Sequence, residues 1–391
     1  MESSLPPTPF DAVVDPEPIE AAVRSGRPVP KADEFAAQIK ETADKLLRDG
    51  AARGDVKLVA TAVRELRYCF KVFAAYRGTR KAVVFGSART KADHPAYAAA
   101  EVFGRRIVEE GWMAITGAGS GIMEAGHKGA GRDRSFGLNI LLPFEQSANP
   151  VVHGDPKLVT LRYFFTRKLM FIKEADAVVL FPGGFGTHDE AYEALTLVQT
   201  GKSHIFPIVM VDEPGGSYWK MWERFVEDAL VARGYISPHD LRLFRVTDSV
   251  EEAIKEVTGF YRVYHSMRYV RGSLVLRLRS KLSDRLLERI GWGFGDILAG
   301  GKFEQVGALP EEARHRPPAA AHRRDQRRGV TADRFAPSRR LTPAGGSEAT
   351  RQTHQDPRKH LRGAPLASRD RQGAGDVSRS LAVAARRAVL Y

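Results

Sequence analysis

Between residues 81 and 250, short and almost unbroken apolar runs alternate with segments of helical pattern, and this alternation constrains the fold more than any other feature. The runs are KAVVF, WMAIT, SFGLNI, ADAVVLF and IFPIVMV. Runs this short and this apolar are typical of parallel strands covered on both faces. The pattern therefore predicts an α/β fold, a Rossmann-like doubly wound parallel sheet with helices on both faces. A ligand crevice is expected at the carboxyl ends of its strands.

The rest of the chain divides by composition. The first 30 residues hold seven of the 22 prolines, which predicts a disordered arm. Apolar residues at helical spacing follow, and Gly50 is expected to end the first of two helices. The predicted segments are a Pro-rich arm (1–30), an N-terminal helical extension (31–78), a Rossmann-like α/β domain (79–265), a C-terminal helical extension (266–313) and a basic, Arg-rich tail (314–391).

The net charge of +13 is concentrated in the tail. Residues 314–391 hold 18 Lys and Arg against 6 Asp and Glu, whereas residues 1–313 hold 42 against 41. One interpretation is a disordered tail that binds nucleic acid. The other is a reading-frame shift near Glu312, because an out-of-frame GC-rich gene yields arginine-rich, lysine-poor sequence. A nucleic-acid partner is expected only if the tail is genuine.

Several classes of protein are disfavoured by composition. A single cysteine, Cys69, excludes an internal disulfide framework and a cysteine zinc cage, and it is expected to be a buried apolar residue. No apolar stretch reaches the roughly 20 residues that span a bilayer, and the acidic, Pro-rich start is no secretory signal. The expected location is the cytoplasm, with no membrane partner. No metal ligands beyond His188 and Asp189 can be located, so no metal is expected.

Two glycine clusters follow predicted strands, TGAGSGIME at 116–124 and PGGFGTHDE at 182–190. Glycines between a strand and a helix let a phosphate approach backbone N–H groups at the positive end of the helix dipole. A single such turn can also be a tight connection without a ligand. Two clusters, expected at adjacent strand ends, favour a phosphate site. The first is G-x-G-x-G, not G-x-G-x-x-G, and no G-K-[ST] follows, which weakens a dinucleotide or P-loop interpretation.

Charged residues near the second cluster have two interpretations each. Thr187 and Glu190 match the capping box T-x-x-E, so Glu190 could serve only to cap its helix. Arg167 and Lys168, on the preceding predicted helix, could be a solvated basic pair or a clamp for an anion in the crevice.

Together these motifs resemble the LOG family, the cytokinin riboside 5′-monophosphate phosphoribohydrolases and related bacterial nucleotide nucleosidases. The resemblance rests on PGGxGTxxE at 182–190, Arg167-Lys168 upstream and TGxGxGxME at 116–124, and it runs from about Lys81 to Thr258. GLNILLPFEQSANP, YFFTRK and EALTLVQTGK are similar to the bacterial branch. His188 departs from the apolar residue more common in the family, which indicates local tuning of the pocket.

The resemblance implies hydrolysis of the N-glycosidic bond of a nucleoside 5′-monophosphate to free base and ribose 5-phosphate. It implies catalytic roles for Glu190, near the ribose, and for Arg167, near the base or phosphate. No cofactor is expected, and family members are commonly homodimers or larger homo-oligomers. The residues expected to bind substrate are Ser87, Gly119, Gly121, Met123, Lys168, Gly183, Gly184, Gly186 and Thr187.

Two questions remain open at this level. A non-catalytic nucleotide sensor or carrier, similar to molybdenum-cofactor carriers, could keep the phosphate loops, although retention of Arg167 and Glu190 favours the enzyme. The preferred base could be adenine, an N6-modified adenine or a pyrimidine. Members of the family long carried a lysine decarboxylase label, but the sequence offers no convincing pyridoxal-phosphate lysine site.

Overall fold

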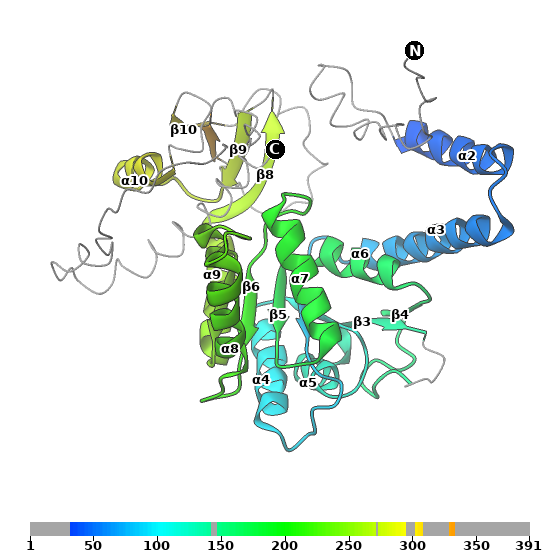
Figure 1. Cartoon of the computed structure of the whole chain (residues 1–391), viewed down its shortest axis with the longest axis horizontal. Coiled ribbons are helices and arrows are strands. Elements are labelled where there is room, and N and C mark those ends of the chain that lie inside the picture. Colours follow the sequence, from blue (N-terminus) through cyan, green and yellow to red (C-terminus); the bar gives the residue numbers. More distant parts are fainter. Residues whose placement is uncertain (1–31, 142–146, 271–272, 295–301, 308–327, 333–391) are drawn as a thin grey trace, which may run out of the picture.

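The computed structural model describes residues 32–141, 147–270, 273–294, 302–307 and 328–332. Its centre is a seven-stranded sheet in which every neighbouring pair is parallel, with the order β4-β3-β2-β1-β5-β6-β7 (Figure 1). The predicted doubly wound sheet is therefore confirmed. The strands are β1 (Lys81–Phe85), β2 (Met113–Thr116), β3 (Ser135–Ile140), β4 (Leu158–Leu161), β5 (Ala177–Leu180), β6 (Ile208–Val211) and β7 (Phe244–Thr247).

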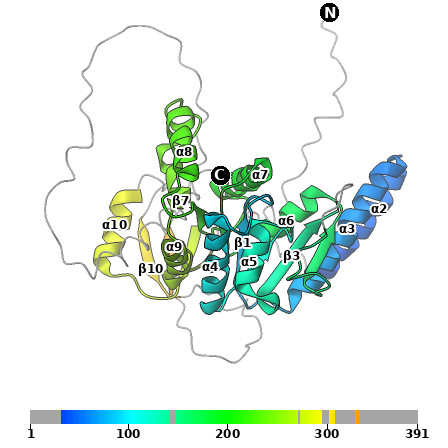
Figure 2. The same ribbon diagram turned by 90° about the horizontal axis from the view of Figure 1, so that it is seen from below.

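Helices cover both faces of this sheet (Figure 2). Alternate residues of β1 show the two layers: Ala82 and Val84 pack with α4, α5 and α9, whereas Val83 and Phe85 pack with α3, α6, α7 and α8. This two-sided burial explains why the central strands read as continuous apolar runs. The helices are α3 (Arg53–Ala74), α4 (Pro95–Glu109), α5 (Ile122–Ala130), α6 (Phe164–Glu174), α7 (Phe185–Gln199), α8 (Tyr218–Phe225) and α9 (Val250–Val263).

Short helical segments complete the α/β layer. Helix α8 is followed directly by a π-helical segment, η3 (Val226–Val231). Two 3₁₀ turns, η2 (Arg132–Arg134) and η4 (Pro238–Leu243), lead into β3 and β7. Ser237 caps η4 with a complete capping box, so this motif does occur in the chain, although not where the sequence predicted it.

The order of the strands places the crevice. From β1 the chain proceeds outward to β4 and then returns to β5 on the other side of β1, so the topological switch lies between β1 and β5. The two glycine clusters follow β2 and β5. They were expected at adjacent strand ends, and this is wrong, because β1 lies between the two strands. The loop after β1, which contains Ser87, therefore lies between them.

The N-terminal helical extension consists of α2 (Ala32–Arg48) and α3. Cys69 and Phe73 of α3 are buried against the sheet. Burial raises the pKa of the Cys69 thiol to about 11, so the thiol stays protonated and acts as a small apolar side chain.

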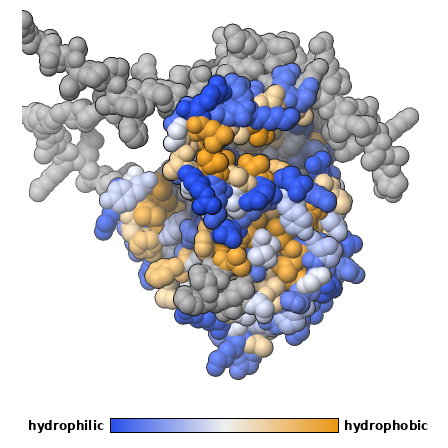
Figure 3. Space-filling model, turned by 90° about the vertical axis from the view of Figure 1, so that its right-hand side faces the viewer, coloured by the Kyte–Doolittle hydropathy of each residue, from blue (hydrophilic) through white to orange (hydrophobic). Residues whose placement is uncertain are grey.

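An apolar surface lies on the side of the molecule that carries α2, α3 and α6 (Figure 3). No residue of α2 is buried, although its sequence is amphipathic. Large apolar side chains on these helices are exposed, namely Ile39, Leu47, Leu58, Val59, Val63, Phe70, Phe164, Phe165 and Leu169. An unpartnered face of this kind is typical of a protein–protein contact.

The segment after α9 corrects a prediction. Residues 266–313 were expected to be helical, but most of the ordered elements are strands, and the only helix in the described part of the segment is α10 (Asp284–Phe294). The strands of the segment are β8 (Tyr264–Val270), β9 (Ser273–Leu278) and β10 (Phe303–Val306). Together with β11 (Arg328–Ala332), from the tail, they form an antiparallel sheet of order β10-β11-β9-β8. Two residues separate β8 from β9, and β-branched and aromatic residues in both favour a hairpin over a helix.

β11 also corrects the prediction of an unstructured tail, because residues 328–332 pair with both β9 and β10. Val330 and Thr331 supply a β-branched pair in the middle of this strand. The other residues of the tail, and the Pro-rich arm, lie outside the described residues. Within the described ranges no helix has the length and apolar character to cross a membrane.

Candidate active site

A cavity of about 830 Å³ opens at the carboxyl ends of β1, β2 and β5. It brings together nine of the eleven residues predicted for the site; Lys168 and Gly121 do not line it. The predicted residues on its wall are Ser87, Gly119, Met123, Arg167, Gly183, Gly184, Gly186, Thr187 and Glu190. Asn139 and Ile140 of β3 add a fifth segment, so residues from five separate segments converge on one space of the size that binds small molecules.

Helix α7 begins at Phe185, with Gly184 as its N-cap and no side-chain cap hydrogen bond. The predicted capping box is therefore wrong. Since the helix starts three residues earlier than a Thr187 cap requires, Thr187 lies in the first turn and Glu190 lies in the second. Among the first N–H groups of α7, that of Thr187 donates to Gly184 O at 3.0 Å, whereas those of Phe185 and Gly186 have no backbone partner among the described residues. Unpaired N–H groups at a helix start are an arrangement that binds anions.

Gly183 allows the loops after β1 and β5 to pack against each other. A Cβ atom at Gly183 would lie 2.1 Å from Thr187 Oγ1 and 2.9 Å from Ser87 N. Ser87 N in turn donates to Pro182 O at 3.1 Å. Any side chain at Gly183 would push these loops apart, whereas a Cβ at Gly184 or Gly186 would meet nothing within 4 Å.

His188 supports the glycine loop after β5 through Tyr218. The Tyr218 hydroxyl donates to Gly183 O, which can only accept, and it lies 2.6 Å from His188 Nε2. Since the Tyr218 proton is used in this way, His188 Nε2 must carry a proton and donate to the hydroxyl. Burial lowers the pKa of His188, which favours the neutral ring. The residue that departs from the family pattern therefore helps to fix the glycine loop, and its side chain also lines the cavity.

The first glycine loop is strained and is held by a buried network. Ala118 has φ of +62°, a left-handed conformation that is rare for a residue with a side chain. Asn149 donates to Gly119 O at 2.9 Å, and its backbone N–H donates to Ala118 O at 2.8 Å. Behind it lies His127, which contacts Asn149, and burial lowers the pKa of His127 to about 4, so the ring is neutral.

Gly121 has a structural role. Its φ is +65°, and a Cβ there would lie 2.3 Å from Ser87 O. Ser87 O accepts the Ile122 N–H at 3.0 Å, which joins the loop after β1 to the start of α5. Gly121 therefore does not line the cavity, but it allows the loop after β1 to pack against the start of α5. Met123, one turn into α5, does line the cavity.

Arg167 extends from α6 to the cavity wall. Its Nε donates to Leu138 O at 2.8 Å, and Nη2 lies 3.5 Å from Gly117 O. Burial lowers the pKa of Arg167, and the charge of Glu190 opposes this effect. An arginine has too high an ordinary pKa to lose its proton, so the cavity contains a fixed, partly desolvated positive charge.

Glu190 is 7% exposed and lines the cavity. Burial raises its pKa to about 7, and the positive charges of Lys168 and Arg167 limit the rise. Its Oε2 has no hydrogen bond to any described residue, although Lys168 Nζ lies 3.3 Å away. A buried carboxyl group with a pKa near neutrality can exchange a proton at physiological pH.

Lys168 does not line the cavity, and its ammonium group contacts residues of α7. Its Nζ contacts Asp189 and Glu193 at 2.8 Å each, in addition to Glu190. Burial opposes its charge, but hydrogen bonds to Asp189 and Glu193 raise the pKa of Lys168 to about 12. Lys168 was predicted to bind substrate, whereas its contacts indicate that it positions α7 and moderates the charge of Glu190.

Two aromatic residues of the wall were not singled out in the sequence. Phe185 is 95% exposed and Phe164 is 53% exposed, and both line the cavity. An exposed phenyl ring beside a cavity offers a flat apolar face to a ligand. Phe185 lies inside the PGGFGT motif, so the motif contained this signal. Asn139 and Arg89 are further wall residues without a sequence signal.

The described residues contain no group of three or more His, Cys, Asp or Glu side chains arranged to hold a metal ion. The charged groups that line the cavity are Arg89, Arg167, Asp189 and Glu190, together with the neutral ring of His188. The chemistry available from these side chains is proton transfer and electrostatic stabilisation.

Comparisons with known proteins agree on one family. A family model described as "Possible lysine decarboxylase" matches residues 117–257. A cytokinin riboside 5′-monophosphate phosphoribohydrolase of Mycobacterium tuberculosis is 30% identical over 161 residues, which are 40% of this chain and 82% of that protein. The enzyme of the same name LOG7 from Arabidopsis thaliana is 29% identical over 190 residues, 47% of this chain and 83% of that protein.

Among solved structures, the molybdenum cofactor carrier protein of Chlamydomonas reinhardtii is similar at 20% identity and a TM-score of 0.33, over 46% of this chain and 96% of that one. A similarity of this size carries no functional information.

Proposed function

The chain belongs to the LOG family, and from its cavity we propose that it hydrolyses the N-glycosidic bond of nucleoside 5′-monophosphates to free base and ribose 5-phosphate. The observation that carries the proposal is one wall that combines the start of α7, a charged arginine and a buried glutamate whose pKa is about 7. The relatives that match are phosphoribohydrolases by name.

The 5′-phosphate would bind at the start of α7. The N–H groups of Phe185 and Gly186 open the helix, and the helix dipole favours an anion there. No side chain caps these groups within the described structure, so a ligand oxygen can take that place. Gly184 and Gly186 leave the space in front of the backbone open.

Glu190 would act on the ribose and the attacking water. Cleavage of the C1′–N bond builds positive charge on the ribose ring, as in glycoside hydrolysis, and a carboxylate nearby stabilises it. The same carboxylate can take a proton from the water whose oxygen forms the new bond to C1′. General base catalysis of this type contributes roughly 10²–10⁴ in rate.

Arg167 would stabilise the leaving base or the phosphate. The electron pair of the broken bond goes to the base nitrogen, which gains the proton that Glu190 takes from the attacking water. The guanidinium is held by Leu138 O and remains charged in a partly desolvated site, where a fixed positive charge acts more strongly than in water.

The base would stack on Phe164 or Phe185, whose rings are exposed at the cavity. Stacking tolerates different bases. It therefore supports a nucleoside monophosphate without selecting adenosine monophosphate over a cytokinin riboside monophosphate.

The proposal also includes a homodimer or larger assembly that forms through the exposed face of α2, α3 and α6. The exposed apolar residues of this face support it. A cytoplasmic location stays a prediction.

The test is release of free base and ribose 5-phosphate from a panel of nucleoside 5′-monophosphates, with the matching nucleosides as controls. We expect turnover of monophosphates only, and a loss of about 10²-fold or more in Glu190→Ala and Arg167→Ala. Tight binding of monophosphates without any turnover would instead favour a nucleotide sensor or carrier.

A further inference from the structure

Arg89 lies on the loop after β1, between the two glycine clusters, and lines the cavity described above. Neighbouring elements hold the backbone of this loop on both sides. Ser87 N donates to Pro182 O at 3.1 Å, and Ser87 O accepts the Ile122 N–H at 3.0 Å. The Arg89 N–H donates to Ser87 Oγ at 3.1 Å. The backbone from which the Arg89 side chain extends is therefore fixed against the loop that leads into α7.

The side chain of Arg89 is exposed at the cavity, and its guanidinium group has no hydrogen bond or ion pair with any described residue. The other charged groups of the wall are held. Arg167 donates to a backbone carbonyl of β3, and Asp189 and Glu190 both contact Lys168. Within the described part of the chain, Arg89 is thus the charged group of this wall whose donors are free to bind a ligand.

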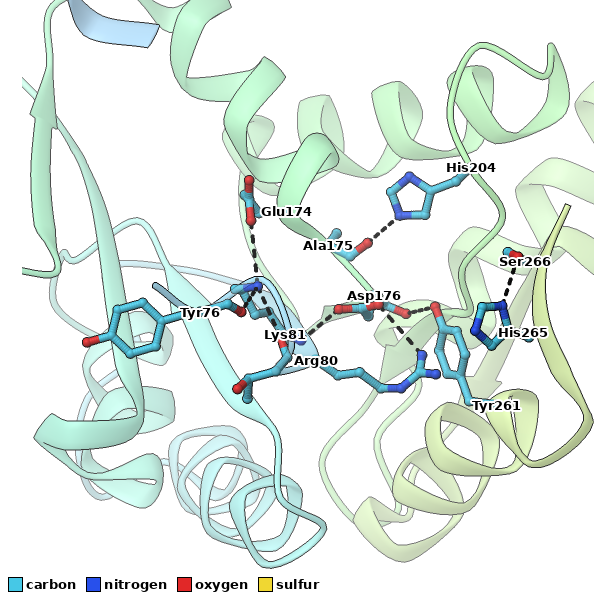
Figure 4. A network of polar contacts seen from close by, with 11 residues as sticks. Tyr76, Arg80, Lys81, Glu174, Ala175, Asp176, His204, Tyr261, His265 and Ser266 are labelled. Carbon is cyan, nitrogen blue, oxygen red and sulfur yellow. Dashed lines mark hydrogen bonds and ion pairs between the residues drawn. The ribbon is translucent and has the colours of Figure 1, made fainter. Parts of the chain in front are cut away.

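The amino end of the same strand shows how cations are held when they join parts of the fold (Figure 4). Arg80, directly before β1, pairs with Asp176 at 3.6 Å, and its guanidinium carbon lies 3.5 Å from the centre of the Tyr261 ring. Lys81 Nζ donates to two backbone carbonyls at 3.0 Å each. Arg89 has no contact of these kinds, so its charge does not hold the described structure together.

A phosphate at the start of α7 needs a cation in addition to the helix. The dipole of a helix is equivalent to about half a positive charge at its start, whereas a phosphate monoester carries about −1.5 to −2 at pH 7. The free N–H groups of Phe185 and Gly186 and the hydroxyl of Ser87, whose proton is not used in accepting the Arg89 N–H, supply neutral donors. An arginine adds a full charge and planar donors that match phosphate oxygens.

Arg167 is held farther along the sheet. Its Nε donates to Leu138 O in β3, and a Cβ atom at Gly117, after β2, would lie 2.3 Å from its Nη2. β1 lies between these strands and β5, which α7 follows. In contrast, a Cβ atom at Gly183, just before α7, would lie 2.9 Å from Ser87 N. The loop that carries Arg89 is therefore the direct neighbour of the start of α7.

We propose that Arg89 selects substrates that carry a 5′-phosphate, because its guanidinium group binds this phosphate at the start of α7 and leaves Arg167 to stabilise the leaving base. This assignment rests on the proposed function. Glu190, which is 7% exposed and whose Oε2 has no hydrogen bond to a described residue, is independent support for a ligand in the same cavity. Arg89 binds substrate in this scheme and takes no part in bond cleavage.

The test is isothermal titration calorimetry of the full chain with ribose 5-phosphate, the part that all nucleoside 5′-monophosphates share, and with ribose as the ligand without phosphate. The variants are Arg89→Ala, Arg89→Lys and, as a matched control, Lys91→Ala, which removes an exposed cation of the same segment that does not line the cavity. We expect Arg89→Ala to weaken binding of ribose 5-phosphate about tenfold or more. Arg89→Lys keeps the charge and should lose less, and Lys91→Ala should bind as the wild type does.

Two further measurements separate this role from a structural or catalytic one. Since the Arg89 side chain has no partner among the described residues, Arg89→Ala should keep the melting temperature of the wild type. With a nucleoside 5′-monophosphate as substrate, Arg89→Ala should raise KM more than it lowers kcat, because a contact with the phosphate exists before and during bond cleavage.

The outcomes distinguish this role from the proposed reaction. Binding of ribose 5-phosphate that Arg89→Ala does not weaken more than Lys91→Ala does would overturn the role of Arg89, even if monophosphates are hydrolysed. Absence of binding to the wild type, or a loss confined to kcat, would overturn it as well. Binding that depends on Arg89 without turnover of any monophosphate would support the phosphate contact and contradict the proposed reaction.

Discussion

Lys168 Nζ lies 3.3 Å from Glu190 Oε2, and it approaches this carboxyl group from outside the cavity. The same ammonium group contacts Asp189 and Glu193 at 2.8 Å each. The cation next to the proposed catalytic carboxylate is therefore tied to α7 and does not occupy the ligand space. Its effect on the reaction is exerted through the pKa of Glu190.

This arrangement predicts a shifted pH profile for Lys168→Met. Removal of the cation leaves burial and the charge of Glu193, which raise the pKa of Glu190, opposed only by the charge of Arg167, so the pKa moves above the present value of about 7. If catalysis requires the carboxylate form, the acidic limb of kcat/KM moves to higher pH. The measurement is kcat/KM between pH 5 and 9.

Lys168→Arg is the matched control, because it keeps the positive charge at this position. Its acidic limb should stay near that of the wild type. An acidic limb that stays in place in Lys168→Met would show that Lys168 does not set the protonation of Glu190, or that Glu190 does not limit the rate.

Burial of Glu190 also predicts how stability depends on pH. Its pKa is raised from 4.5 to about 7 on folding, so the unfolded state loses the proton more easily and stability falls as the pH rises through this window. The shift corresponds to on the order of 3 kcal/mol at pH values above 7. Glu190→Gln should therefore be more stable than the wild type at pH 8.

Denaturant unfolding at pH 8, 6 and 4 measures this difference. The advantage of Glu190→Gln should shrink as the pH falls from 7 to 4.5 and should vanish below 4.5, where the carboxyl group is protonated in both states. An advantage that is constant over this range would mean that the effect comes from packing and not from ionisation.

We expect opposite effects on the melting temperature for alanine at two positions of the glycine loop after β5. Gly183→Ala places a methyl group 2.1 Å from Thr187 Oγ1 and 2.9 Å from Ser87 N, so we expect a lower melting temperature. Gly186→Ala meets nothing within 4 Å, so it should keep the fold. Since Gly186 lies on the cavity wall, its methyl group should still weaken binding of a monophosphate.

Thermal unfolding and calorimetric titration of both variants make this comparison. Equal melting temperatures for Gly183→Ala and the wild type would contradict the packing of the two loops. Full affinity in Gly186→Ala would argue against phosphate binding at the start of α7.

Phe185 predicts a change in substrate affinity. Its ring is 95% exposed at the cavity and packs against little else, so Phe185→Ala should leave the fold intact. Loss of base stacking costs roughly 1–3 kcal/mol per base, which predicts a KM at least about fivefold higher. Steady-state kinetics measure it, with Phe225→Ala, at an exposed residue of α8 outside the cavity, as control. Equal KM values for both variants would exclude the stacking role.

Much of the fold could be predicted, because parallel strands and their crossover helices leave a strong pattern. The runs KAVVF and ADAVVLF became β1 and β5, and Glu190 and Arg167 lie on one cavity as expected. The hairpin of β8 and β9 was missed. Arginines stand among the aromatic and β-branched residues of these strands and obscure the alternation of apolar and polar side chains.

Details of the site depended on geometry that a motif does not contain. T-x-x-E fits a helix whose N-cap is Thr187, but Gly184 is also an acceptable N-cap, and the helix begins directly after it, at Phe185. Arg167 and Lys168 were treated as a pair, yet neighbours on a helix point about 100° apart. Only one of the two side chains can therefore line the cavity, and the position of α6 beside α7 determines that it is Arg167.

The most direct measurement of the central claim is the rate of ribose 5-phosphate release from a nucleoside 5′-monophosphate by the wild type and by Glu190→Gln, together with the affinity of both for that substrate. We predict that the variant binds the monophosphate with similar affinity and releases product at least about 10²-fold more slowly. Product release by Glu190→Gln at the rate of the wild type would contradict a catalytic role of this carboxyl group.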